Sequence, residues 1–112
     1  MAGVTSLNSI WGKTYNFLAA TGKGAVAIGY NTLASGNYSF ASGCRTRASA
    51  LYSFAEGCDT RAEGSHSHAE GWETKAYAPH SHSEGCYSEA GSPGTNLGQY
   101  SHVEGYKTVS HG

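Results

Sequence analysis

Apolar and polar positions along this chain recur every fourteen residues. Short units of the form Ser-x-Ala-x-Gly occur at 39–43, 53–57 and 67–71, with variants at 81–85 and 101–105. A second track repeats at the same step, with threonines at 32, 46, 60 and 74, each followed two residues later by alanine. Self-similarity at a short fixed period is typical of solenoids, in which each repeat packs only against its neighbours.

The alternation within each unit predicts short strands stacked in coils. Side chains alternate between the two faces of a strand, so the Ser/Ala and Thr/Ala columns face one way and the larger residues face the other. A coil of fourteen residues is too narrow for large side chains, so the small columns must face inward. The repeat glycines are predicted to turn the corners, where a residue without Cβ adopts positive φ. The expected fold is an all-β parallel solenoid over residues 24–112.

The outward column of the first half of each coil is unusually large and apolar for a surface. It begins with aliphatic and aromatic residues and changes to histidine and glutamate in the later coils. Apolar stripes on a surface mark interaction sites, and so thin a rod buries too little area to be stable alone. We therefore expect identical chains to associate through the following residues: Val26, Ile28, Tyr38, Phe40, Tyr52, Phe54, His66, His68, Glu70, His80, His82, Glu84, His102 and Glu104.

These units resemble a known family. Residues 25–29, Ala-Val-Ala-Ile-Gly, and the Ser-x-Ala-x-Gly units resemble the head repeats of trimeric autotransporter adhesins of the YadA type. The Ser-His-Ala-Glu-Gly variant at 67–71 is similar to repeats of bacteriophage tail fibres and appendages. The resemblance covers residues 24–112 and implies a left-handed parallel β-roll, with three chains side by side and the Val/Ile column buried between them. The chain departs from the adhesin pattern in its late histidines and glutamates, and an adhesin head of this length would be a fragment.

Residues 1–23 precede the repeat and hold the densest apolar cluster of the chain. A solenoid end exposes a strand edge, which terminal segments usually cover. This segment is therefore predicted to be an N-terminal cap or a docking segment for other virion or fibre proteins. The residues expected to dock are Ile10, Trp11, Tyr15, Phe17 and Leu18.

One interruption breaks the period, because the step from Ser81 to Ser101 is twenty residues. The extra residues fall at about 91–98, where glycine and proline indicate a loop that leaves the stack. One interpretation is a tolerated bulge without a role. The other is a receptor-binding loop, formed by Thr95, Asn96, Leu97, Gln99 and Tyr100.

Charge, hydropathy and cysteine positions argue against several kinds of partner and site. The formal net charge of −1 gives no reason to expect a nucleic-acid partner, and no apolar run is long enough for membrane insertion. The three cysteines, Cys44, Cys58 and Cys86, each follow a repeat glycine and so share one column. That recurrence indicates packing positions rather than a zinc site or a disulfide.

The histidines are the residues that suggest metal chemistry, chiefly His66, His68, His80 and His82. Alternate residues of one strand lie about 7 Å apart, too far to share an ion, whereas vertical neighbours are about 4.8 Å apart and stack. Stacking with glutamate at a subunit interface is therefore favoured over metal binding, and no cofactor is predicted. The glutamates recur in every later coil, which indicates a structural role, and no enzyme activity is predicted.

Together these features predict a structural, trimeric fibre or spike segment for attachment to a host cell, located on a virion or at the cell surface. The expected partners are two further copies of the chain and a cell-surface glycan or protein receptor. Two alternatives stay open. One is a self-polymerising extracellular filament subunit that stacks its coils head to tail. The other is a carbohydrate-binding or depolymerase tailspike module.

Overall fold

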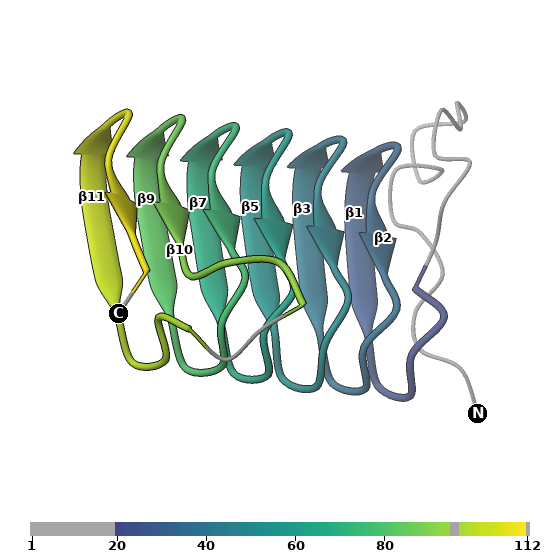
Figure 1. Ribbon diagram of the computed structural model, residues 1–112. Helices are drawn as coiled ribbons and strands as arrows, with labels where there is room; N and C mark the ends of the chain where they lie inside the picture. Colours follow the sequence, from purple (N-terminus) through teal and green to yellow (C-terminus); the bar gives the residue numbers. More distant parts are fainter. Residues whose placement is uncertain (1–19, 95–96, 112) are drawn as a thin grey trace.

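The long strands of the chain stack in parallel, one coil above the next (Figure 1). The computed structural model describes residues 20–94 and 97–111. The long strands are β1 (Val26–Tyr30), β3 (Phe40–Cys44), β5 (Phe54–Cys58), β7 (His68–Trp72), β9 (His82–Cys86) and β11 (His102–Tyr106). The short strands are β2 (Leu33–Ala34), β4 (Arg47–Ala48), β6 (Arg61–Ala62), β8 (Lys75–Ala76), β10 (Glu89–Ala90) and β12 (Val109–Ser110). The predicted all-β parallel solenoid is confirmed.

Each set of strands forms its own parallel sheet, and equivalent positions of successive units pair with each other. In the long-strand sheet Phe40 pairs with Phe54, and Gly43 with Gly57. The solenoid begins before residue 24, because Ala20 forms a parallel β-bridge with Ala34. The twenty-residue step leaves the register intact, because His102 pairs with His82. The extra residues are therefore accommodated between β10 and β11.

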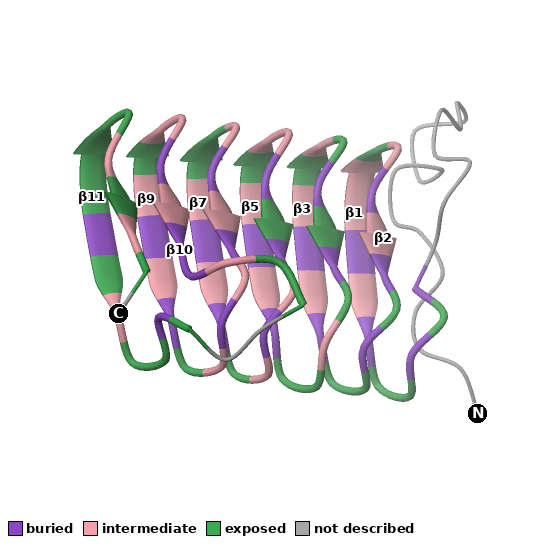
Figure 2. Cartoon of the chain, viewed as in Figure 1, coloured by how far each residue is buried: buried purple, intermediate pink, exposed green. Residues whose placement is uncertain are grey.

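The interior consists of small side chains, as the alternation predicts. A buried band crosses the middle of every long strand (Figure 2), and the largest side chains that are fully buried are threonines and serines. The inward positions include Ala27, Ala41, Ala55, Ala69 and Ser83 from the long strands, and Ala34, Ala48, Ala62, Ala76 and Ala90 from the short ones. Little apolar area is therefore buried within one chain.

The corners differ from the prediction that the repeat glycines turn them. The repeat glycines lie inside the long strands, with φ between 109° and 125°. The corners also use non-glycine residues with positive φ, such as Arg45 (56°) and Tyr52 (56°). This region disfavours side chains with a Cβ. The neighbouring coil compensates, because the Tyr52 N–H donates to the Asn37 carbonyl (3.0 Å) and the Arg45 N–H donates to the Tyr30 carbonyl (2.7 Å).

Several predicted residues lie outside the described part of the chain. They are the docking residues Ile10, Trp11, Tyr15, Phe17 and Leu18, and the loop residues Thr95 and Asn96. Of the other loop residues, Leu97, Gln99 and Tyr100 are exposed. The described ranges contain no helix long and apolar enough to cross a membrane.

The inward threonines offer a matched test of the interior. The hydroxyl of Thr74 donates to the Glu70 carbonyl (2.9 Å), whereas the buried hydroxyl of Thr60 has no hydrogen-bond partner among the described residues. Because an unpaired buried hydroxyl is unfavourable, we expect Thr60→Val to leave stability unchanged or raise it by up to about 1 kcal/mol. Thr74→Val should lower it by about 1 kcal/mol. Urea unfolding of both variants measures the difference, and equal losses would contradict it.

Candidate functional site

The outer face of the long-strand sheet carries two adjacent columns of large side chains. The first residue of each strand forms one column, which runs from Val26 through Phe40 and Phe54 to three histidines. The third residue forms the other, which runs from Ile28 and Ser42 to four glutamates. Both columns point outward because the residue between them, an alanine, serine or valine, is buried. We call His68, His82 and His102 the histidine column, and Glu56, Glu70, Glu84 and Glu104 the glutamate column.

Rings of the first column stack continuously from coil to coil. The Phe40 and Phe54 ring centroids lie 4.7 Å apart, and Phe54 meets His68 edge to face. The imidazoles of His68 and His82 lie 4.6 Å apart with an interplanar angle of 2°. Those of His82 and His102 lie 4.8 Å apart, at 3°. The predicted stacking of these histidines is confirmed, while their place in a subunit interface stays a prediction.

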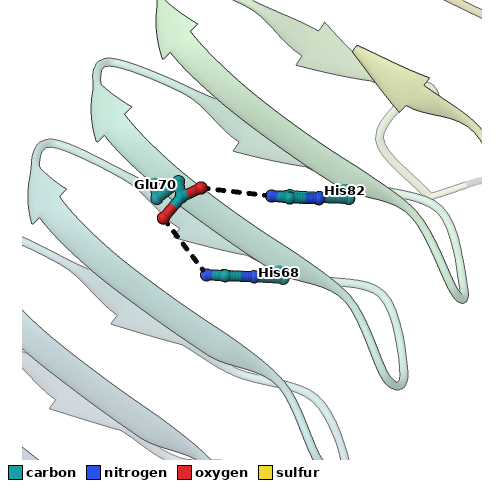
Figure 3. Close-up of side chains that lie close together, drawn as sticks. All are labelled: His68, Glu70 and His82. Atoms are coloured by element: carbon teal, nitrogen blue, oxygen red, sulfur yellow. Dashed lines mark ion pairs between the residues drawn. The ribbon is translucent and has the colours of Figure 1, made fainter. Parts of the chain in front are cut away.

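One carboxylate serves two stacked imidazoles. Glu70 directs Oε1 toward Nε2 of His82 (3.4 Å) and Oε2 toward Nε2 of His68 (3.8 Å) (Figure 3). Glu84 repeats the arrangement one coil later, with Oε2 3.8 Å from His82 and Oε1 3.4 Å from His102. The Nε2 atom of His68 also lies 3.6 Å from Glu56. His68 and His82 therefore each face carboxylates from two successive coils.

The ring nitrogens at the centre of this arrangement are incompletely satisfied. The Nε2 atoms of His68 and His82 are shielded from solvent, yet neither makes a hydrogen bond of good geometry with any described residue. Buried polar atoms of this kind are uncommon in folded proteins and call for an explanation. Their nearest polar neighbours are the carboxylate oxygens, at distances too long for strong hydrogen bonds.

A shallow groove runs along the glutamate column. Its volume is about 670 Å³, and its lining consists mainly of glutamate side chains and repeat glycines. Carboxylates on adjacent strands are separated by about 4.8 Å, and like charges placed directly opposite one another repel. The groove therefore favours cations. Its lining residues are Ser42, Glu56, Gly57, Glu70, Gly71, Glu84, Gly85, Glu104 and Gly105.

His66 and His80 belong to a separate column at the corner of the coil. Their imidazoles stack on each other at 4.9 Å and continue a stack of tyrosines, with Tyr52 on His66 and Tyr100 on His80. Both histidines have positive φ, which turns them away from the strand alternation. Among the described residues, the groups with metal-ligand spacing contain the histidine column and not His66 or His80. The four histidines singled out in the sequence therefore divide into two sets.

The column that follows the repeat glycines holds the cysteines. Cys44 pairs with Cys58 in register, and all three thiols are free. Burial, and next the neighbouring Cys58, raise the pKa of the Cys44 thiol. Beside them Arg45 forms an ion pair with Asp59 (2.9 Å). Contacts with Cys58 and Asp59 raise the pKa of this guanidinium, so it stays charged at all relevant pH values.

The outward column of the short-strand sheet is mostly charged, as expected for a solvated face. It contains Arg47, Arg61, Lys75 and Glu89, with an ion pair between Lys75 and Glu89 at 4.0 Å. The apolar members of the long-strand face, by contrast, are half-buried at most within one chain. These are Val26, Ile28, Phe40 and Phe54. The two faces of the solenoid therefore differ sharply in polarity over the first coils.

Comparison with known proteins identifies the repeat. The family model of the YadA head domain repeat matches residues 20–43, in two copies. No curated protein and no solved structure matches the chain. The matched residues cover β1, β2 and all but the last residue of β3, and the later coils continue the same register. The chain thus carries YadA-like head repeats.

Proposed function

We propose that this chain is the head of a homotrimeric surface adhesin, in which three left-handed solenoids pack side by side through their long-strand sheets. The observation that carries the proposal is the apolar stripe of Val26, Ile28, Phe40 and Phe54, which a single chain leaves partly exposed. The match to the YadA head domain repeat over residues 20–43, which include Val26, Ile28 and Phe40, supports it. The role is mechanical attachment of a cell surface to its target, without catalysis.

The composition of the interior favours association. Side chains that are fully buried within one chain are small, so each contributes little to the hydrophobic stabilisation of a monomer. The four large apolar side chains of the stripe supply much more area, but only when a second surface covers them. Closed symmetry around the stripe covers it in every copy at once, whereas an open contact would leave the outermost copies uncovered.

Removal of the stripe gives the direct test. Wild-type protein is expected to have three times the 11.7 kDa chain mass in light scattering. A Phe40→Ser/Phe54→Ser variant should dissociate to monomers and melt at a lower temperature, because it loses the stacked rings at the centre of the stripe. Leu51→Ser is the control, because Leu51 is 41% exposed and lies outside the stripe. A monomeric wild-type protein, or a double variant that stays trimeric, would contradict the proposal.

Attachment is tested separately from assembly. Purified trimer should bind animal cells or extracellular matrix in a saturable manner if it is an adhesin head. The Ser-His-Ala-Glu-Gly unit at 67–71 favours a second candidate, a fibre segment of a bacteriophage, which should instead bind bacterial cells. Binding to neither surface, by a protein of confirmed trimeric mass, would remove the attachment role and leave the assembly intact.

A further inference from the structure

We infer that the histidine and glutamate columns bind divalent transition-metal ions of the zinc class. Each ion lies in the plane of one imidazole and is held by Nε2 and by carboxylate oxygens of two successive coils. The two proposed ligand sets are His68 with Glu56 and Glu70, and His82 with Glu70 and Glu84. These sites form within one chain, so they do not depend on the proposed trimer.

The distances from each ring nitrogen to its two carboxylates approach those between ligands of a four-coordinate ion. Zinc bonds to imidazole nitrogen and carboxylate oxygen are about 2.0–2.2 Å long, so neighbouring ligands of a tetrahedral ion lie about 3.3–3.5 Å apart. At His68 the Nε2 to oxygen distances are 3.6 and 3.8 Å, and at His82 they are 3.4 and 3.8 Å. The two carboxylates of each set must also turn toward one point, because the groups whose ligand atoms already lie within 4.8 Å of one another join one glutamate to two histidines. A water molecule would supply the fourth ligand.

The ring geometry argues against one ion shared by two histidines. The His68 and His82 rings are parallel to within 2° and 4.6 Å apart. The lone pair of Nε2 lies in the plane of its ring, so the two lone pairs run side by side and do not converge. An ion midway between the nitrogens would lie out of both planes. One imidazole per ion, with Glu70 giving one oxygen to each of two ions, matches the observed directions (Figure 3).

The ligand chemistry selects the class of ion. Mixed imidazole and carboxylate ligands suit zinc, nickel and copper, whereas calcium and magnesium prefer oxygen alone. Bound cations would also neutralise the stacked carboxylates of the groove and occupy the shielded Nε2 atoms that lack hydrogen bonds. The apolar stripe lies on β1, β3 and β5, while the histidines of the sites lie on β7 and β9. The two features meet on β5, which carries both Phe54 of the stripe and Glu56 of the first site.

Calorimetric titration of the metal-free full-length protein with zinc chloride tests the inference. Wild-type protein should bind about two ions per chain, with little response to magnesium. His82→Gln should lose one ion. Glu70→Gln should weaken both sites by more than about tenfold, because its carboxylate is shared. His80→Gln is the matched control, since its ring is stacked in the same way but has no carboxylate partner among the described residues.

The free thiols require their own control, because cysteine also binds zinc. A Cys44→Ser/Cys58→Ser/Cys86→Ser variant should keep the same stoichiometry, and cobalt bound to it should show ligand-field bands of a four-coordinate ion. The inference is overturned if wild-type protein shows no saturable zinc binding. It is also overturned if the triple serine variant loses the binding, or if His80→Gln loses as much as His82→Gln. Circular dichroism and light scattering of each variant separate these outcomes from failed folding or assembly.

Discussion

Gly57→Ala is expected to be among the most damaging small substitutions in the described residues, with a loss of at least about 4 kcal/mol of unfolding free energy. A Cβ on Gly57 would collide with the carbonyl oxygen, carbonyl carbon and amide nitrogen of Gly71 in the next coil. Those atoms are backbone, and the sheet ladder fixes them in place. The φ of 111° adds strain of about 1–3 kcal/mol. A loss of this size is a large fraction of the total unfolding free energy of an ordinary domain.

Gly94→Ala separates the two causes. Gly94 also has positive φ, at 70°, but a Cβ there would meet no atom of the described residues within 4 Å. This variant should lose only the conformational contribution, about 1–2 kcal/mol. Thermal melting followed by circular dichroism compares the two variants with wild-type protein. If Gly57→Ala melts no lower than Gly94→Ala, the prediction is contradicted, because a Cβ at Gly57 would then cause no additional loss of stability.

Ala55→Leu is expected to have the second largest effect, a loss of about 3 kcal/mol or more, at the upper end for overpacked cores. Ala55 is fully buried, and its register partners on the adjacent strands, Ala41 and Ala69, are buried as well. A leucine side chain would have to displace the backbone of its own coil. The in-register pairing would pass that displacement to both neighbouring coils.

Arg61→Leu is the matched substitution on the outside of the same region. The Arg61 side chain is 49% exposed and pairs with Glu63 at 3.5 Å. Loss of an exposed ion pair costs at most about 1 kcal/mol. In urea unfolding, Ala55→Leu should therefore have a much lower midpoint concentration than Arg61→Leu. Similar midpoints for the two variants would mean that the interior has more room than the burial of Ala55 indicates.

The interior and the strand order were predictable from the sequence because both follow from simple periodicity. The fourteen-residue step sets which residues pair, and the alternation of small and large residues sets which side faces inward. The insertion after β10 was also visible as a break in the step. The corners were less predictable. Nothing local marks Arg45 or Tyr52 for positive φ, and the compensating hydrogen bonds come from a different coil.

The candidate site was predicted only in part, for a related reason. Strand alternation placed His66 and His68 on one face, but positive φ at His66 moves it to the corner column. The vertical stacking of His68 on His82 was predicted from strand spacing and is confirmed. The sharing of Glu70 between the two imidazoles depends on glutamate rotamers and on distances of a few ångströms. Sequence spacing does not specify such details.

The in-register pairing of equivalent positions has a consequence for how such a protein changes length. Because each unit meets the next through the same set of contacts, duplication or deletion of a whole unit by recombination joins surfaces that already fit. Each added unit lengthens the rod by about 4.8 Å and extends every surface column by one residue. The length of the rod can thus change in steps of one coil, while its cross-section stays the same.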